Sequence, residues 1–185
     1  TKLRGQLASC ERSRALDEAI SARQTRAMHV NLLVELRFAA TPQAAFELSL
    51  DPQRFPTLFR GFGPIPALRA IRLHAAAAVG STRDVEDVKG VVMLERITAL
   101  EPAQRHAYTL SGFTAPLSWL AREAHADWRF SPTAEGALVA WTYRFELTSP
   151  LALPLAFPIL RVFMQGAMQR CLAAMARELA PGASR

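Results

Sequence analysis

An arginine and a glutamate on two neighbouring strand-like segments are the residues of this sequence best placed to do chemistry. The segment 87–90 (DVKG) between them predicts a hairpin loop with Gly90 in the left-handed conformation. That register sets Arg83 opposite Glu95, on the same face as the apolar Val85. Burying a charged pair on an apolar face is costly unless the two groups bond each other. We therefore expect a partly exposed structural bridge at a cavity rim, a ligand anchor, or a catalytic pair.

Strand parity places further polar and aromatic side chains on the inner face of the same sheet. Tyr108 and Tyr143 could donate hydrogen bonds to a ligand carbonyl or hydroxyl, or could satisfy a backbone acceptor. Arg122 joins this face if no bulge interrupts its strand. The expected ligand-binding set is Arg83, Glu95, Tyr108, Arg122, Trp128, Trp141, Tyr143 and Phe163.

Signatures of other chemistries are not found in the sequence. His29, His74, His106 and His125 lie far apart, with no carboxylate partner at a metal-ligand spacing. The two cysteines, Cys10 and Cys171, form neither a C-x-x-C pair nor a regular spacing. No nucleophile elbow, phosphate loop or dinucleotide fingerprint occurs. We expect no metal, no cofactor and no disulfide.

The charge pattern bears on partners and location. The net charge is +6, and the first 28 residues carry +3 of it, from six basic and three acidic side chains. The remaining arginines are interspersed with acids, which indicates a solvated surface rather than a nucleic-acid site. Neither a signal peptide nor a membrane span is expected, although transient contact with a membrane stays open. A reducing, cytoplasmic setting and a monomer or homodimer are expected.

The elements that must position these residues follow from periodicity. Residues 29–38 alternate apolar and polar side chains, which predicts a half-buried strand. Thr41-Pro42 predicts the start of a short helix, with a second helical piece over 52–59. Six strands of an antiparallel meander are then predicted, at residues 68–76, 79–87, 91–99, 105–113, 119–131 and 137–148.

A change to helical periodicity follows, with a long helix predicted over residues 157–179 and a kinked start at Pro154 and Pro158. A seven-stranded sheet has one face to bury, and this helix is the element left to cover it. We therefore predict an α+β helix-grip fold: a curved antiparallel sheet around a long helix and an apolar cavity. Residues 28–185 form this single domain, and residues 1–27 are an extension, helical or disordered.

Local patterns at four places resemble the SRPBCC or START-like superfamily, specifically its polyketide cyclase/dehydrase and lipid-transport family. They are residues 40–46, 62–66, 80–85 with 95–98, and 128–130 with 135–143. The last resembles the family's tryptophan strand, turn and "G-G-T-x-V-x-W" strand, with Glu135 and Ala137 where glycine and threonine are usual. The resemblance covers residues 30–180 and implies a cavity between sheet and helix.

Three functions remain open at this level. The first is binding or carrying a small hydrophobic molecule, such as a lipid, sterol-like compound or polyketide. The second is a polyketide cyclase or dehydratase with Glu95 as general base and Arg83 or Tyr108 as oxyanion donor. The third is a protein-interaction module that uses the arginine-rich extension or an apolar mouth formed by residues 114–120 and 151–157.

Overall fold

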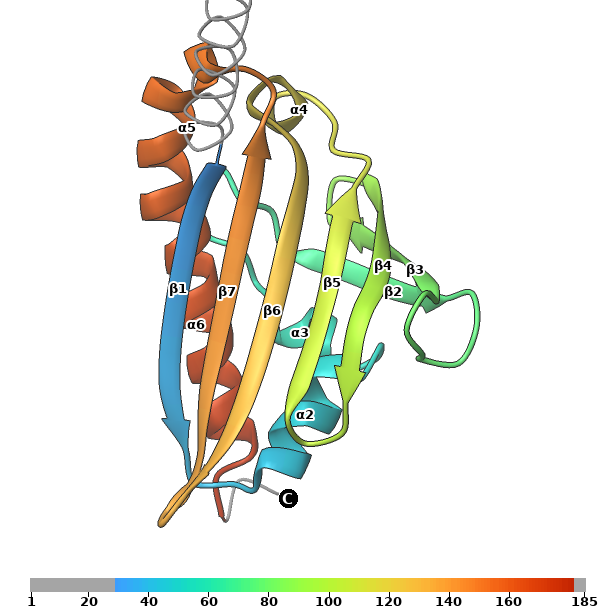
Figure 1. Ribbon diagram of the computed structural model, residues 1–185, viewed down its shortest axis with the longest axis vertical. Coiled ribbons are helices and arrows are strands. Elements are labelled where there is room, and N and C mark those ends of the chain that lie inside the picture. Colours follow the sequence, from blue (N-terminus) through green and yellow to red (C-terminus); the bar gives the residue numbers. More distant parts are fainter. Residues whose placement is uncertain (1–28, 182–185) are drawn as a thin grey trace, which may run out of the picture.

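A seven-stranded antiparallel sheet curves around one long helix in the computed structural model, which describes residues 29–181 (Figure 1). The expected extension at residues 1–27 lies outside the described residues. The strands run in the order β1-β7-β6-β5-β4-β3-β2, so six consecutive strands form a meander and β1 joins it beside β7. The curved sheet and the long helix of the predicted helix-grip fold are confirmed.

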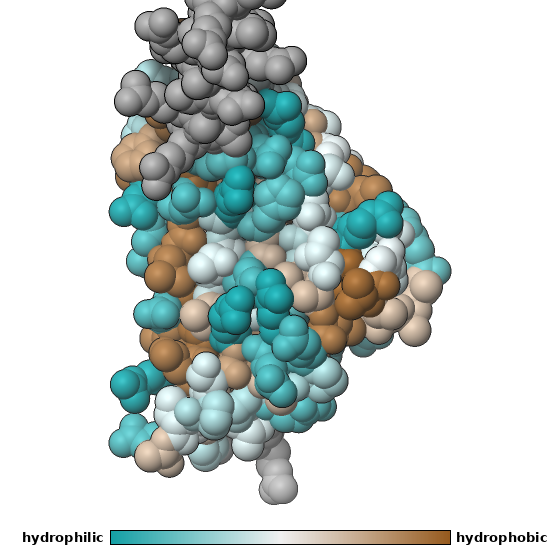
Figure 2. All heavy atoms as spheres, viewed as in Figure 1, coloured by the Kyte–Doolittle hydropathy of each residue, from teal (hydrophilic) through white to brown (hydrophobic). Residues whose placement is uncertain are grey.

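The strands agree closely with the predicted segments. They are β1 (His29–Phe38), β2 (Leu68–Leu73), β3 (Thr82–Asp87), β4 (Val92–Glu101), β5 (Arg105–Ser111), β6 (Ala121–Thr133) and β7 (Gly136–Leu147). Alternation produces the layer structure, because the inward side chains of β7 are buried while those between them are half-buried or exposed. Figure 2 shows the outer face, where hydrophilic side chains gather over the middle of the sheet.

Two short helices, α2 (Pro42–Leu50) and α3 (Phe55–Leu58), follow β1 and cover part of the inner face. The predicted cap is present: Thr41 Oγ1 accepts a hydrogen bond from the Ala44 N–H at 3.2 Å. Phe55 packs edge-on against Trp128 and Trp141, which anchors α3 to the sheet.

The long helix is continuous from α5 (Leu153–Ile159) through a π-helical segment, η2 (Leu160–Met164), into α6 (Gln165–Glu178), after a short 3-10 turn, η1 (Pro150–Ala152). It begins a turn earlier than predicted, and Pro158 lies inside it. By length and composition alone, Pro150–Glu178 could cross a membrane. In the structure 33% of its apolar window is buried, and the buried side chains of α6 pack on the sheet.

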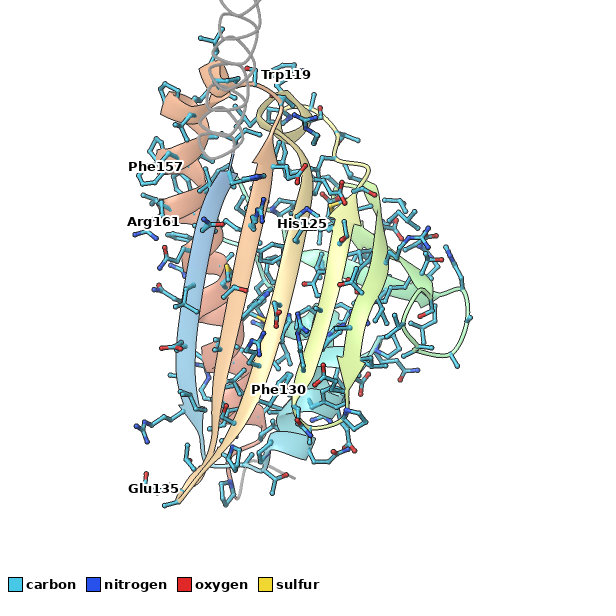
Figure 3. The ribbon with its side chains drawn as sticks, in the orientation of Figure 1. Trp119, His125, Phe130, Glu135, Phe157 and Arg161 are labelled. Carbon is cyan, nitrogen blue, oxygen red and sulfur yellow. The ribbon has the colours of Figure 1, made fainter. Side chains whose placement is uncertain are left out.

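The apolar segments expected to form a mouth meet at one end of the sheet. Residues 114–120 contain a one-turn helix, α4 (Leu117–Leu120), which contacts α5 (Figure 1). Large apolar side chains there remain in solvent: Trp119 is 71% exposed, Leu151 90% and Phe157 51%. In Figure 3, Phe157 and Arg161 project from the helix away from the sheet.

Candidate functional site

The predicted hairpin register is confirmed, with Arg83 directly opposite Glu95. Arg83 Nε donates to Glu95 Oε1 at 2.7 Å, and each residue is only 3% exposed. The expectation of a partly exposed bridge at a cavity rim is therefore wrong. The end of α2 lies against the pair, and Arg83 Nη1 donates to the Leu50 carbonyl oxygen at 3.4 Å. Burial raises the pKa of the Glu95 carboxyl, and the facing guanidinium opposes that rise.

Two tyrosines from non-adjacent strands form a second buried polar pair. Tyr108 on β5 and Tyr143 on β7 both pair with Ala126 on the strand between them. The alanine side chain is too short to separate the rings, so the two hydroxyl oxygens lie 2.9 Å apart. Burial is the main cause that raises the pKa of both hydroxyls, which therefore stay protonated. One proton forms the bond between them, and the other is free to be donated elsewhere.

A histidine that sequence reasoning did not place in the site lies beside these tyrosines. His106 is fully buried, its ring centroid is 5.2 Å from that of Tyr108, and its Nδ1 lies 3.5 Å from Ser49 Oγ. Burial, assisted by the charge of Arg83, lowers the pKa of His106 to about 3, so the ring is neutral. The parity that placed Tyr108 on the inner face also applies two residues earlier, and that signal could have found His106.

Trp128 and Trp141 complete the inner surface as a stacked pair with ring centroids 4.0 Å apart. Both indole Nε1 atoms are buried without a well-formed hydrogen bond among the described residues, and the Trp128 indole N–H faces the Tyr108 hydroxyl closely enough to lower its pKa. Buried donors ordinarily find an acceptor. With the tyrosine pair, they add donors to a largely apolar face that also holds Arg83, Glu95 and His106.

Two of the expected ligand-binding residues lie away from this face. The strand register shifts between Ala121 and Glu123, and this bulge turns Arg122 outward, where its guanidinium donates to the Leu147 carbonyl oxygen. The prediction that Arg122 points inward is wrong for that reason. Phe163 is half-buried and packs on the loop after α3, with its ring centroid 5.8 Å from that of Phe62.

The outer face of the sheet carries a histidine with carboxylates nearby, contrary to expectation. His125 Nε2 lies 3.4 Å from Glu146 Oε1, and with Glu123 these residues bring three donor atoms within 4.8 Å of one another. His74 also has a partner, Asp84. The bulge in β6 and the pairing of Glu123 with Glu146 produce the cluster, which sequence spacing alone does not reveal. Figure 3 shows His125 on the side of the sheet opposite the helix.

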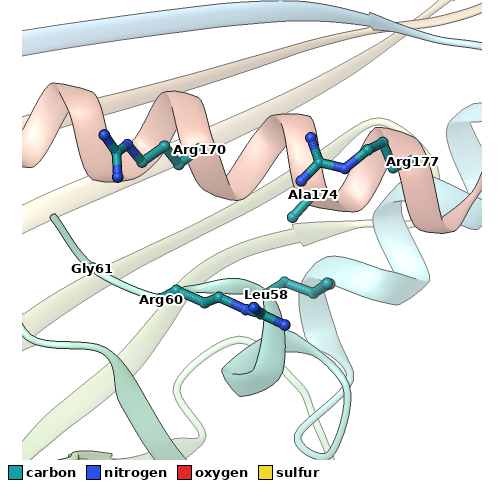
Figure 4. A pocket seen from close by; sticks show the side chains of 6 residues that line it. All are labelled: Leu58, Arg60, Gly61, Arg170, Ala174 and Arg177. Atoms are coloured by element: carbon teal, nitrogen blue, oxygen red, sulfur yellow. The ribbon is translucent and has the colours of Figure 1, made fainter.

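A surface groove of about 590 Å³ lies between α6 and the chain that leaves α3 (Figure 4). It is lined by Leu58, Arg60, Gly61, Arg170, Ala174 and Arg177. Phe55 and Phe59, one turn before and one residue after Leu58, have buried side chains that pack against Trp141. The segment 55–61 therefore separates the groove from the buried polar residues.

Comparison with known proteins places these features in context. Residues 29–180 match the family described as polyketide cyclase / dehydrase and lipid transport. No curated protein gave a significant match. Among solved structures, the di-domain ARO/CYC StfQ from the steffimycin biosynthetic pathway has a TM-score of 0.68 at 17% identity, covering 94% of this chain and 60% of StfQ.

Two further structures are similar over most of their length. Ara h 8.0201 has a TM-score of 0.63 at 15% identity and covers 82% of this chain and 97% of its own. Truncated norcoclaurine synthase from Thalictrum flavum has a TM-score of 0.62 at 13% identity, and the match covers 80% of this chain and 92% of the synthase. Identities this low establish a common fold and nothing about the ligand.

Proposed function

Because the chain belongs to the polyketide cyclase/dehydrase and lipid-transport family of the SRPBCC superfamily, we propose that it binds and carries a small hydrophobic molecule bearing a carbonyl or hydroxyl group. The observation that carries this proposal is the Tyr108–Tyr143 pair, which retains one hydroxyl proton on a largely apolar inner face. Apolar surface with a few convergent polar groups is the usual composition of a small-molecule site. The donors on this face suit a ligand that supplies an oxygen acceptor.

The first test is native mass spectrometry of the purified full chain together with analysis of its organic extract. The second compares anthrone, a ketone, with anthracene, which has a similar shape and no acceptor. Binding is followed by the fluorescence of Trp128 and Trp141, which line the proposed site. We expect both compounds to bind, because apolar contact provides most of the affinity.

The double variant Tyr108→Phe/Tyr143→Phe removes both hydroxyls and keeps both rings. Anthrone affinity should fall roughly three- to tenfold, the value of one net hydrogen bond, while anthracene affinity is unchanged. Thr109→Val on the outer face of β5 is the matched control and should change neither. Absence of a co-purifying ligand together with no binding of either compound would refute the carrier proposal. Equal anthrone affinity in both proteins would refute the role of the hydroxyls.

Catalysis by Glu95 is the second candidate, favoured by its raised pKa. The geometry supports it less well, because Arg83 holds the carboxylate and the end of α2 covers the pair. A general base must reach the proton that it removes. We therefore assign Arg83 and Glu95 to positioning the inner face.

The apolar end formed by α4, η1 and α5 is proposed as the point of transient membrane contact. Trp119, Leu151 and Phe157 are more than half exposed there, and tryptophan at such a site suits the lipid–water interface. Co-sedimentation with phosphatidylcholine vesicles should be reduced by Leu151→Ser/Phe157→Ser. The same substitutions should leave anthrone binding in solution unchanged. Equal sedimentation of both proteins would exclude this surface.

A further inference from the structure

The groove between α6 and α3 has one wall built from a single stripe of the helix. Arg170, Ala174 and Arg177 are spaced i, i+4 and i+7, which places them on the same face. The small alanine between two long side chains forms the recess. Figure 4 shows both arginines above this recess, with Arg60 and Leu58 on the opposite segment.

The opposite wall is held by backbone geometry and aromatic packing. Gly61 has a φ of +67°, and a Cβ there would lie 2.2 Å from the Ile65 carbonyl oxygen, so the turn requires glycine. The Phe62 ring packs over Gly166, and the Arg170 guanidinium lies 3.9 Å from the ring centroid. This cation–π contact restrains Arg170 before any ligand arrives.

Positive charge in the groove is not balanced by nearby carboxylates of the described chain. Glu178 on the same helix pairs with Arg54, whose Nε lies 2.7 Å from Glu178 Oε1. Over residues 29–181, Arg60, Arg170 and Arg177 form no ion pair. The position of Arg177 in the last turn of α6 suits the helix dipole, Arg170 stacks on Phe62, and Arg60 Nε donates to the Thr57 carbonyl oxygen at 3.2 Å, but none of these contacts brings a carboxylate to neutralise the charge.

We propose that this groove binds a carboxylate or phosphate monoester carried on an apolar group. Arginine binds both anions through paired N–H donors, and three guanidiniums around one recess can surround such a head group. Leu58 and Ala174 give the recess an apolar side chain on each wall, against which the carbon chain can pack. The volume of about 590 Å³ lies within the range of about 300–1,000 Å³ found for ligand pockets. The site is separate from the inner face and does not depend on the proposed carrier function.

The test is isothermal titration of the full chain at low salt with octyl phosphate, octanoate, octanol and inorganic phosphate. We expect the octyl anions to bind more tightly than octanol, which lacks the charge, and than inorganic phosphate, which lacks the chain. The tighter of octyl phosphate and octanoate identifies the head group. No detectable binding of either octyl anion, or equal affinity for octanol and the better anion, would overturn the proposal.

Arg60→Gln and Arg170→Gln each remove one charge from the groove and should weaken octyl anion binding by about tenfold, the loss expected for one charge-assisted hydrogen bond. Arg161→Gln is the matched control, since Arg161 is an exposed arginine of the same long helix that lies outside the groove and stacks on Phe157. Its affinity should equal that of the wild type. Equal weakening in all three variants would mean attraction by overall surface charge and would overturn the proposal.

Failure of the anion site and failure of the carrier function give different results. Without the anion site, anthrone still binds while the arginine variants behave as wild type toward octyl phosphate. Without the carrier function, anthrone does not bind while octyl phosphate still responds to Arg60→Gln and Arg170→Gln.

Discussion

Arg83 and Glu95 lie directly opposite each other on adjacent strands and form an ion pair in which each residue is only 3% exposed. Two charges have therefore been transferred from water onto an apolar face. Such a pair contributes little net stability, yet it is costly to break, because the remaining charge stays buried without a partner.

Replacing one partner of this pair should destabilise the protein more than replacing both partners with apolar residues. We expect Glu95→Gln to lower the free energy of unfolding by about 3–5 kcal/mol, because the Arg83 charge stays buried. The double variant Arg83→Met/Glu95→Leu should lose far less. Urea unfolding at pH 7 measures both. If the double variant loses as much stability as Glu95→Gln or more, the pair is not acting as a unit.

The tyrosine pair should show the same non-additivity on a smaller scale. Tyr108→Phe or Tyr143→Phe alone leaves one buried hydroxyl without its partner and should cost about 1–3 kcal/mol. Removing both hydroxyls should cost less than the sum of the single losses. A double-mutant cycle from chemical denaturation gives the coupling energy, and a value of zero would show that the 2.9 Å contact is energetically neutral.

His106 should make the protein less stable in acid. Its folded pKa of about 3 lies below the ordinary histidine pKa of 6.5, so between these pH values the unfolded chain binds a proton that the folded chain does not. Stability from this residue is complete above pH 6.5 and is lost as pH falls toward 3. Between pH 7 and pH 5 the loss should be about 2 kcal/mol.

His106→Gln should remove this part of the pH dependence, as measured by urea unfolding at the two pH values. Other groups that titrate in acid contribute equally to both proteins and cancel in the comparison. An unchanged difference between pH 7 and pH 5 would mean that His106 has the same pKa in the folded and in the unfolded chain.

The effect of Gly166→Ala on stability should change sign with the residue at position 62. A Cβ at position 166 would lie 2.5 Å from the Phe62 ring, so Gly166→Ala should destabilise the protein. With Phe62→Ala in place the contact is gone, and alanine's helix propensity should make Gly166→Ala stabilising by up to about 1 kcal/mol. Thermal unfolding of the four proteins provides the test, and stabilisation in both backgrounds would contradict it.

Sequence reasoning succeeded where a local rule determines the geometry. Alternation gave the strands, Thr41-Pro42 gave a helix start, and Gly90, with a φ of +84°, gave the hairpin register that brings Arg83 to Glu95. The main wrong prediction from a local rule was the inward direction of Arg122, because a one-residue bulge in β6 reverses the direction of that side chain.

Features built from distant segments were missed because periodicity carries no information about them. The burial of Arg83 depends on the end of α2, and the groove arginines meet across 110 residues, from Arg60 to Arg170. The Glu123–His125–Glu146 cluster requires both the bulge and the pairing of β6 with β7. Only the three-dimensional arrangement brings these groups together.

The place of β1 beside β7 also determines how the chain can fold. The other strands pair with neighbours in sequence and can form as successive hairpins, but Val30 pairs with Phe145, 115 residues later. Closing so long a loop costs entropy before any contact compensates it. During synthesis, β1 therefore has no partner strand until β7 has left the ribosome. In that interval its apolar side chains can associate with other chains or bind chaperones.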